Sequence, residues 1–323
     1  MRLSVAFSGF SGLAETVDVV MAAEKYGLDG VWTAEHLGFH DAVVPSAVYL
    51  TKTNRIEIGL VGLSTAGRHP ALTGMELMSL SELAPGRIRC QVGLGDPGLV
   101  AKLGRKISRP ATSTMAFVNS LRETMQGRDM KVVYPDFTFD GFRLSPLGPI
   151  PAIDVMAIRP KMVQTAARVG DGLSISVGAS MAYIRDVVKD VERELAATGR
   201  DRSNFRITAM AMAAIGNDLD SLRAPMGPML SSFPQETAAF LARGVVDSEE
   251  LLRVQAELGP LGVMKLWTPE KIDQIAFIAT PEMLADRMAQ YAETGIDELA
   301  LMLNNPLAEQ PDIIKQLSAA HEE

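Results

Sequence analysis

The chain has 323 residues, of which 47% are hydrophobic and 22% are charged, and its formal net charge is −8 at neutral pH. This composition provides enough apolar surface for a large folded core and argues against wholesale disorder. The acidic balance argues against a nucleic-acid partner or an anionic membrane surface, although it permits a local site for an anionic ligand. The length fits one large barrel or two ordinary domains.

The single cysteine, Cys90, stands in an apolar run, and we interpret it as a small buried hydrophobe. One cysteine allows no disulfide within the chain, which fits a reducing, cytoplasmic location. The first residues begin directly on a strand pattern and lack the features of a signal peptide. No apolar stretch is long enough to span a bilayer, so we expect no membrane partner.

Strand patterns alternate with helix patterns from one end of the chain to the other. Strands are predicted at residues 3–7, 31–34, 56–63, 88–92, 153–157, 172–177, 205–215 and 298–303. Eight strands in such alternation are the number that a (β/α)8 TIM barrel requires, and this is the fold class we predict. No linker or shift in composition divides the chain, so residues 1–323 are expected to form a single domain.

Two segments interrupt the alternation, one after the fourth predicted strand and one after the seventh. Residues 131–145 combine aromatic and β-branched residues with turn signals, which favours a β-excursion. Residues 218–269 belong to a mostly helical stretch that prolines break repeatedly. We expect the first insertion to lie over the barrel mouth and both insertions to shape a substrate pocket.

An acid and a histidine, Glu35 and His36, stand where the second predicted strand ends. The carboxyl ends of barrel strands carry the chemistry of such folds. These two residues fit a general acid/base pair or a charge-tuned histidine, with a surface ion pair as the alternative. His36 and His40 are four residues apart, but Gly38 and the loop character of the segment argue against a helix that presents both, so no metal site is predicted.

The segment Gly93-Leu94-Gly95-Asp96-Pro97-Gly98 satisfies the pattern G-x-G-x-x-G and follows a strand. A dinucleotide site would need a helix that opens inside the motif and an acid at the end of the next strand. We expect Pro97 to interrupt the motif, and the next strand pattern is far away. A glycine-rich loop that lets a flat ligand approach the backbone is therefore the favoured interpretation.

Helix starts after two later strands offer sites for an anion. Pro160 suits a first helical turn after Arg159, and Gly178-Ala179-Ser180 occupies the same place after the next strand. Exposed N–H groups at helix starts attract anions, so the two together indicate a phosphate cradle. Ordinary loop geometry explains the spacing equally well.

The chain is rich in methionine, with 18 residues of this type. Met210 and Met212 share one face of a predicted strand, and Met156 lies in another. Because methionine fills irregular apolar space, core filling is one interpretation, and a wide pocket for a bulky apolar ligand is the other.

Seven short segments, spread over nearly the whole chain, together indicate a known family by their order and spacing. They are 30–36 (GVWTAEH), 53–59 (TNRIEIG), 68–71 (RHPA), 93–96 (GLGD), 159–162 (RPKM), 170–172 (GDG) and 279–282 (ATPE). With these segments the chain resembles the bacterial luciferase-like superfamily, and within it the coenzyme F420-dependent reductases such as methylenetetrahydromethanopterin reductase.

The resemblance implies a TIM barrel that binds a flavin or deazaflavin at its carboxyl mouth. It places His36 near the reactive face of the cofactor. It also implies a bulge with a non-prolyl cis peptide bond in Val61-Gly62-Leu63, pressed against the ring. The phosphate loops of the family map onto Ala157, Ile158, Arg159, Val177 and Gly178. Members of the family are often homodimers, so the resemblance implies that this chain can also form a homodimer.

Two residues depart from the pattern of the F420 branch. The branch usually has Asp-His where this chain has Glu35-His36, a pair common among flavin-dependent members. It usually has glycine before Pro-Lys-Met, where Arg159 adds a charged donor and loses the close backbone approach that glycine permits. Both departures leave FMN open as the alternative cofactor, whereas Arg68-His69-Pro70 and the stretch 103–110 are closer to the F420 branch.

From the resemblance we predict an oxidoreductase that transfers a hydride between coenzyme F420 and a small organic substrate. His36 is predicted to donate or accept a proton or to orient the substrate. Glu35 is predicted to tune the charge of His36 or contact the substrate, and Asp96 to act as a second acid. One alternative is an FMN-dependent monooxygenase supplied by a separate reductase, and another is a non-catalytic flavin-binding protein of the same fold.

Overall fold

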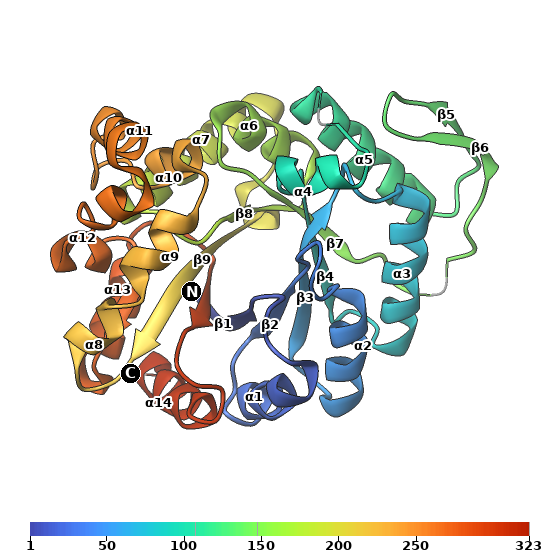
Figure 1. The fold of residues 1–323 in the computed structure, drawn as a ribbon. Helices are drawn as coiled ribbons and strands as arrows, with labels where there is room; N and C mark the ends of the chain where they lie inside the picture. The colour runs from blue at the N-terminus through green and yellow to red at the C-terminus, as the bar shows by residue number, and fades with distance from the viewer. Residues whose placement is uncertain (107, 147, 323) are drawn as a thin grey trace.

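The computed structural model describes residues 1–106, 108–146 and 148–322. Eight parallel strands of this part of the chain form a closed barrel (Figure 1). They are β1 Arg2–Phe7, β2 Gly30–Ala34, β3 Glu57–Ser64, β4 Ile88–Gly93, β7 Ala152–Met156, β8 Gly172–Ile175, β9 Arg206–Ile215 and β11 Glu298–Leu303. The ring closes because β9 pairs with both β11 and β8. The predicted (β/α)8 TIM barrel is therefore confirmed.

Helices surround the barrel and cover its outer face (Figure 1). The longer ones are α1 Leu13–Lys25, α2 Val43–Lys52, α3 Pro70–Leu83, α5 Pro110–Met125, α6 Pro160–Val169, α7 Met181–Thr198, α11 Ser248–Met264, α13 Leu284–Ala292 and α14 Gln310–Glu322. The shorter ones are α4 Pro97–Lys102, α8 Leu219–Arg223, α9 Met226–Ser232, α10 Gln235–Leu241 and α12 Pro269–Asp273, together with the 3-10 helices η1 Arg202–Asn204 and η2 Pro281–Met283. In the described ranges, no helix combines the length and the apolar character needed to cross a membrane.

Side chains close the amino-terminal half of the barrel. The fully buried Glu298 accepts hydrogen bonds from Trp32 Nε1 at 2.8 Å and from Arg206 Nη1 at 3.2 Å. Arg206 also pairs with Glu57 at 2.5 Å. The Trp32 ring lies on Gly59, where an added Cβ would be only 2.1 Å from the ring. Charged and aromatic side chains therefore fill this end of the barrel, and active sites of such barrels lie at the opposite end, where the strands have their carboxyl ends.

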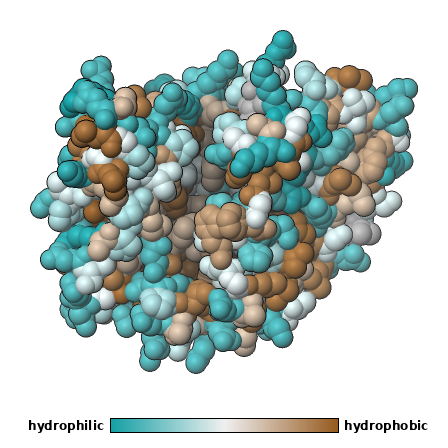
Figure 2. Space-filling model, in the orientation of Figure 1, coloured by the Kyte–Doolittle hydropathy of each residue, from teal (hydrophilic) through white to brown (hydrophobic). Residues whose placement is uncertain are grey.

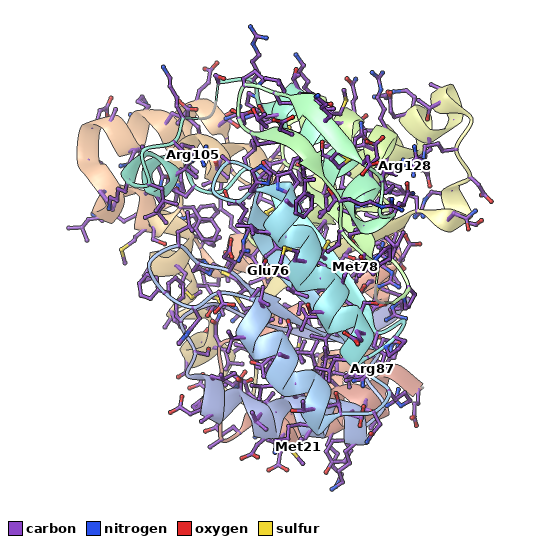
Figure 3. All side chains as sticks on the ribbon, turned by 90° about the vertical axis from the view of Figure 1, so that its right-hand side faces the viewer. Met21, Glu76, Met78, Arg87, Arg105 and Arg128 are labelled. Atoms are coloured by element: carbon purple, nitrogen blue, oxygen red, sulfur yellow. The ribbon has the colours of Figure 1, made fainter. Side chains whose placement is uncertain are left out.

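The first insertion is a β-hairpin, as predicted, but its predicted position is wrong. Its strands are β5 Met130–Val133 and β6 Thr138–Phe142. The hairpin lies outside α3 and α5, away from the barrel mouth (Figures 1 and 3). Phe137 and Phe139 pack against His69, at ring-centroid distances of 5.7 and 4.9 Å. The apolar residues that predicted a strand are thus used to anchor the hairpin on the helical layer.

The second insertion comprises α8 to α12 and lies beside the mouth (Figure 1). Thr237, Met229 and Phe233 from this insertion line the cavities described below. The structure adds a short strand that sequence reasoning missed, β10 Phe277–Ala279, which pairs with the end of β9. Three residues are too few for a strand pattern to be read within a helical region.

Candidate active site

A cavity of about 530 Å³, here called the mouth cavity, opens at the carboxyl ends of the barrel strands. Figure 2 shows the hollow on this face of the molecule. The residues predicted for the site that line the cavity are Glu35, His36, Val61, Gly62, Asp96, Ile158, Arg159 and Val177. Leu63, Ala157 and Gly178 are not in its lining, and the first two are buried in the core between barrel and helices.

The third strand carries the predicted bulge next to the mouth cavity. Its pairing with β4 changes register between Leu60 and Leu63. The described peptide bonds are all trans, so the predicted cis bond in Val61-Gly62-Leu63 is wrong. Gly62 instead adopts φ +79°, a conformation that L side chains rarely reach. An added Cβ there would lie 3.3 Å from the carbonyl oxygen of Glu35, so the glycine allows the bulge without a cis bond.

Glu35 binds an arginine from the loop after β3. The Arg68 Nε donates to the two carboxylate oxygens at 3.1 and 2.9 Å, and Arg68 Nη1 pairs with Glu76 at 2.6 Å. The Glu35 side chain is only 6% exposed and that of Arg68 is 18% exposed. Burial lowers the pKa of Arg68, but the hydrogen bonds and charge of Glu35 outweigh it and raise the pKa overall. The structure therefore joins Glu35 to Arg68, and not to His36 as predicted.

Residues of the loop after β1 contact His36 and hold it in place. The backbone N–H of Gly9 donates to His36 Nδ1 over 3.2 Å, and the Phe10 ring packs on the imidazole at a centroid distance of 4.5 Å. Burial lowers the pKa of His36 below its usual value. A ring that accepts at Nδ1 and is neutral carries its hydrogen on Nε2. His36 is thus placed at the mouth as a neutral hydrogen-bond donor.

Asp96 caps the start of the short helix α4. Its side chain accepts a hydrogen bond from the Leu99 backbone N–H at 2.8 Å, and Pro97 occupies the first helical turn. The expectation that Pro97 interrupts the glycine motif is wrong. Helix α4 begins at Pro97, and proline is tolerated at a helix start. The motif still belongs to a βα loop of a barrel, so the dinucleotide interpretation does not apply. Asp96 lines the mouth cavity, but its carboxylate caps a helix.

A second cavity of about 610 Å³, here called the basic cavity, adjoins the mouth cavity and shares Leu94, Arg159 and Met162 with it. Arg109 and Lys161 also line it. The cavity lies where α5 and α6 begin, and both helices start with an Arg-Pro pair, Arg109-Pro110 and Arg159-Pro160. Arg109 and Lys161 were missed in the sequence, although the repeated Arg-Pro pair before two helices was a usable signal.

A third cavity of about 500 Å³, here called the side cavity, lies on the other side of His36. It shares His36, Val177 and Met302 with the mouth cavity. Strands β1, β9 and β11, helix α9 and the loop that follows β11 supply most of its remaining lining. The described residues form no group of three or more His, Cys, Asp or Glu side chains placed to hold a metal ion.

The family of the chain follows from comparison with known proteins. A family model described as luciferase-like monooxygenase matches residues 2–298. The chain belongs to this family. It is therefore an enzyme, and the resemblance deduced from the seven short segments is confirmed. This luciferase-like chain also has curated relatives that span nearly its whole length.

One such relative is the 5,10-methylenetetrahydromethanopterin reductase of Archaeoglobus fulgidus, which is 25% identical over 93% of this chain and 92% of its own. Another is the F420-dependent glucose-6-phosphate dehydrogenase of Kineococcus radiotolerans, which is 27% identical over 94% of this chain and 90% of its own. Both relatives are oxidoreductases by name, and they match the luciferase-like chain from end to end.

Solved structures have the same fold. The F420-dependent tetrahydromethanopterin reductase of Methanopyrus kandleri superimposes with a TM-score of 0.81, at 14% identity, over 98% of this chain and 97% of its own. An F420-dependent secondary alcohol dehydrogenase, solved with an F420-acetone adduct, also has a TM-score of 0.81, at 20% identity, over 99% of this chain and 98% of its own. At these identities the likeness establishes the barrel architecture alone.

Proposed function

We propose that this luciferase-like enzyme transfers a hydride between coenzyme F420 and a small organic substrate. The observation that carries the proposal is the end-to-end match to a relative named for its F420 dependence, the Kineococcus dehydrogenase, at 27% identity over 94% of the chain. The cavities at the barrel mouth supply the physical support, because they provide a flat apolar site that continues into a basic one.

The mouth cavity suits a flat ring. The Gly62 bulge brings bare backbone to its wall, and Met156, Met210 and Met302 provide an adaptable apolar lining. These side chains support the pocket interpretation of the methionine-rich strands. When bound, F420 supplies a ring carbon that donates or accepts the hydride. The protein's part is to hold the ring, orient the substrate and exclude water.

The basic cavity suits the phosphate-bearing side chain that F420 and FMN share. Arg109, Arg159 and Lys161 gather there, and the backbone N–H groups that begin α5 and α6 add partial positive charge. Arg159 is half exposed, with Glu236 at 3.5 Å and the Phe240 ring 5.2 Å from its guanidinium carbon. This contact holds Arg159 at the junction of the two cavities, where it would bind the phosphate.

The three residues predicted for catalysis, His36, Glu35 and Asp96, have different roles in the enzyme proposed here. His36 orients the substrate beside the ring by a hydrogen bond from Nε2. Glu35 holds Arg68 and so supports the loop after the bulge. Asp96 shapes the loop after β4 by capping α4. Of the three, only His36 is proposed to contact the reacting groups.

The rival cofactor is reduced FMN, supplied by a separate reductase to a monooxygenase. The same cavities accept the FMN phosphate, and the solved neighbours include a long-chain alkane monooxygenase with a TM-score of 0.74 at 14% identity. The chain belongs to a family of enzymes, which argues against the alternative of a non-catalytic flavin-binding protein.

A titration decides between the cofactors. Purified protein is titrated with F420 and, anaerobically, with reduced FMN, and the fluorescence of each cofactor is followed. We expect saturable binding of F420 and at least tenfold weaker binding of reduced FMN. Saturable binding of reduced FMN alone would overturn the proposal in favour of the monooxygenase.

The chain is further proposed to be one domain and to form a homodimer. In support of one domain, the first and last barrel strands, β1 and β11, pair directly, and α14 packs against α1. Sedimentation velocity measures the oligomeric state, and a single calorimetric unfolding transition is expected for one domain.

A further inference from the structure

Helix α10 of the second insertion lies beside the junction of the mouth cavity and the basic cavity. Its Thr237 lines the mouth cavity, and Arg159 lines both cavities. The carboxylate of Glu236 lies 3.5 Å from Arg159 Nη2, and the Phe240 ring lies 5.2 Å from the guanidinium carbon. Residues four apart share one face of a helix, so α10 presents an acid and an aromatic ring to a single arginine.

The carboxyl-terminal end of α10 is fixed to helix α7, independently of this ion pair. The Ser180 backbone N–H donates to the Leu241 carbonyl at 2.9 Å. The Phe240 ring packs against the Tyr183 ring at a centroid distance of 5.9 Å. Because these contacts hold the backbone of α10 in place, the Glu236 carboxylate stays close by when a ligand binds the guanidinium.

The insertion also closes the second position predicted for a phosphate, at the start of α7. The N–H of Met181, the first residue of α7, donates to the Gln274 carbonyl at 3.3 Å. An added Cβ at Gly178 would lie 2.8 Å from the Phe233 ring. The side cavity, on the other flank of the mouth cavity, carries no Asp, Glu, Lys or Arg in its described lining. A phosphate is therefore directed to the basic cavity and to Arg159.

One of the cations of the basic cavity is shared with an acid. Its described lining holds no Asp or Glu, and its cations are Arg109, Arg159 and Lys161. Among the ion pairs of the described residues, only that of Arg159 with Glu236 involves one of these three cations, and the two side chains are 53% and 83% exposed. An exposed pair of this kind is weak, so an anionic ligand competes for Arg159 while the carboxylate remains beside it.

The phosphates of the two candidate cofactors differ in charge. F420 carries a phosphodiester with one negative charge. FMN carries a phosphomonoester, whose second pKa of about 6 gives it close to two negative charges at pH 8. Since the repulsion between the Glu236 carboxylate and a ligand grows with the charge of the ligand, Glu236 disfavours a monoester more strongly than a diester.

We propose that Glu236 is a specificity-determining residue which, beside the arginine it shares with the ligand, selects against doubly charged phosphomonoesters relative to phosphodiesters. The proposal rests on the proposed function, because it takes the basic cavity as the phosphate site, and it deepens that function by naming the charge class of the phosphate. Two unit charges about 6 Å apart in water change an affinity by about threefold. The Glu236 carboxylate is thus expected to weaken the binding of a diester about threefold and that of a monoester about tenfold.

Two matched esters test the charge class without any cofactor. Phenyl phosphate is a doubly charged monoester at pH 8, and methyl phenyl phosphate is the corresponding singly charged diester. Their binding to the full chain, labelled with 13C at the methionine methyl groups, is followed by NMR at low salt. Met162 is the reporter because it lines both cavities, and Met162→Leu assigns its signal.

Glu236→Gln is expected to tighten the binding of phenyl phosphate about tenfold and that of methyl phenyl phosphate about threefold. The ratio of the two dissociation constants should therefore shift about threefold toward the monoester. Glu257→Gln is the matched control, because it removes the same charge from an exposed ion pair on α11 and should leave the ratio unchanged. An unchanged ratio in Glu236→Gln, an equal shift in Glu257→Gln, or no saturable binding of either ester overturns the proposal.

Arg159→Met tests whether the shared arginine is needed. Without this arginine a phosphate is no longer held beside Glu236, so the addition of Glu236→Gln should leave the ratio as it is in Arg159→Met alone. A shift that persists in the double variant overturns the placement of the phosphate on Arg159. Because both esters are measured without F420, the expected ester binding together with a failure of F420 to bind overturns only the proposed function. An unchanged ratio together with saturable F420 binding overturns only the role of Glu236.

Discussion

The backbone N–H of Gly9 donates a hydrogen bond to Nδ1 of His36 over 3.2 Å. The two residues belong to the loops after β1 and β2, and the same pair of loops is joined again by the His40 N–H, which donates to the Gly9 carbonyl at 3.3 Å. An added Cβ at position 9 would lie 3.0 Å from the His36 Cβ, so the loops approach closely. The imidazole is thus fixed by the neighbouring loop, and its orientation is set before any ligand binds.

The lowered pKa of His36 makes folding stability depend on pH. An unperturbed histidine titrates near pH 6.5, and burial lowers the pKa of His36 in the folded state. As the pH falls through 6.5, the unfolded chain binds a proton at this residue that the folded chain does not bind. The free energy of unfolding therefore decreases with falling pH in that window, and above it His36 contributes no pH dependence. Urea unfolding between pH 5 and 8 is expected to show a weaker decrease for His36→Gln than for the wild type. His321→Gln, at an exposed histidine of α14, is the control, and an identical slope in both variants would contradict the prediction.

Removal of Arg68 should destabilise the fold because it leaves the buried Glu35 carboxylate without its partner. For Arg68→Met we expect a loss of about 3 kcal/mol in the free energy of unfolding. Arg68→Met combined with Glu35→Gln should recover part of that loss, since the uncompensated charge is removed as well. Denaturant unfolding measures both values. Arg253→Met is the comparison, because its pair with Glu257 at 3.0 Å is exposed and is expected to contribute less than about 1 kcal/mol. Equal losses at positions 68 and 253 would refute the argument from burial.

Gly62→Ala should separate backbone strain from the role of the bulge. A side chain at φ +79° costs about 1–2 kcal/mol of stability. Gly141→Ala in the hairpin loop is the matched control, because Gly141 has φ +73° and open space around its Cβ position. Gly62→Ala should lose more stability than Gly141→Ala in thermal unfolding, because its added Cβ lies 3.3 Å from the Glu35 carbonyl oxygen, and only Gly62→Ala should bind F420 more weakly in the fluorescence titration. Equal affinities for the two variants would show that the bulge does not contact the ring.

The basic cavity should contribute to cofactor affinity through charge. Lys161→Met removes a cation from its lining, and about tenfold weaker F420 binding is expected, since a hydrogen bond between charged groups contributes about 1.5–3 kcal/mol. The loss should shrink as salt is raised, because salt screens the interaction. Lys315→Met, at an exposed lysine of α14, should leave the affinity unchanged. Salt-independent binding in the wild type would argue against an anionic ligand in this cavity.

The barrel was predictable because its signals are local. Each barrel strand is a short apolar run buried on both faces, and the helices between them follow their own periodicity, so the order of elements could be read along the chain. The same order placed Glu35, His36 and Gly62 at the carboxyl ends of strands, where the mouth cavity lies. The Arg-Pro pairs before α5 and α6 are equally local, but only Arg159 of the second pair was predicted as a site residue.

Other features depend on which segments meet when the ring of strands closes. Glu35 pairs with Arg68, which is 33 residues away, and His36 accepts from Gly9, which is 27 residues away. No periodicity along the chain encodes these distances or chooses between Glu35 as a partner of His36 and Glu35 as a partner of Arg68. The position of the hairpin and the trans geometry at Gly62 were likewise decided by packing.

The amino-acid sequence by itself determined the strands, the helices and the end of the barrel at which the reactive side chains gather, because hydrophobic periodicity and turn residues act over a few neighbouring positions. Only the tertiary structure decided the hydrogen-bonding state of His36, the partner of Glu35 and the division of the mouth into a basic and an uncharged flank. Those properties arise from contacts between loops that are distant in the chain, and the closure of the barrel brings them together.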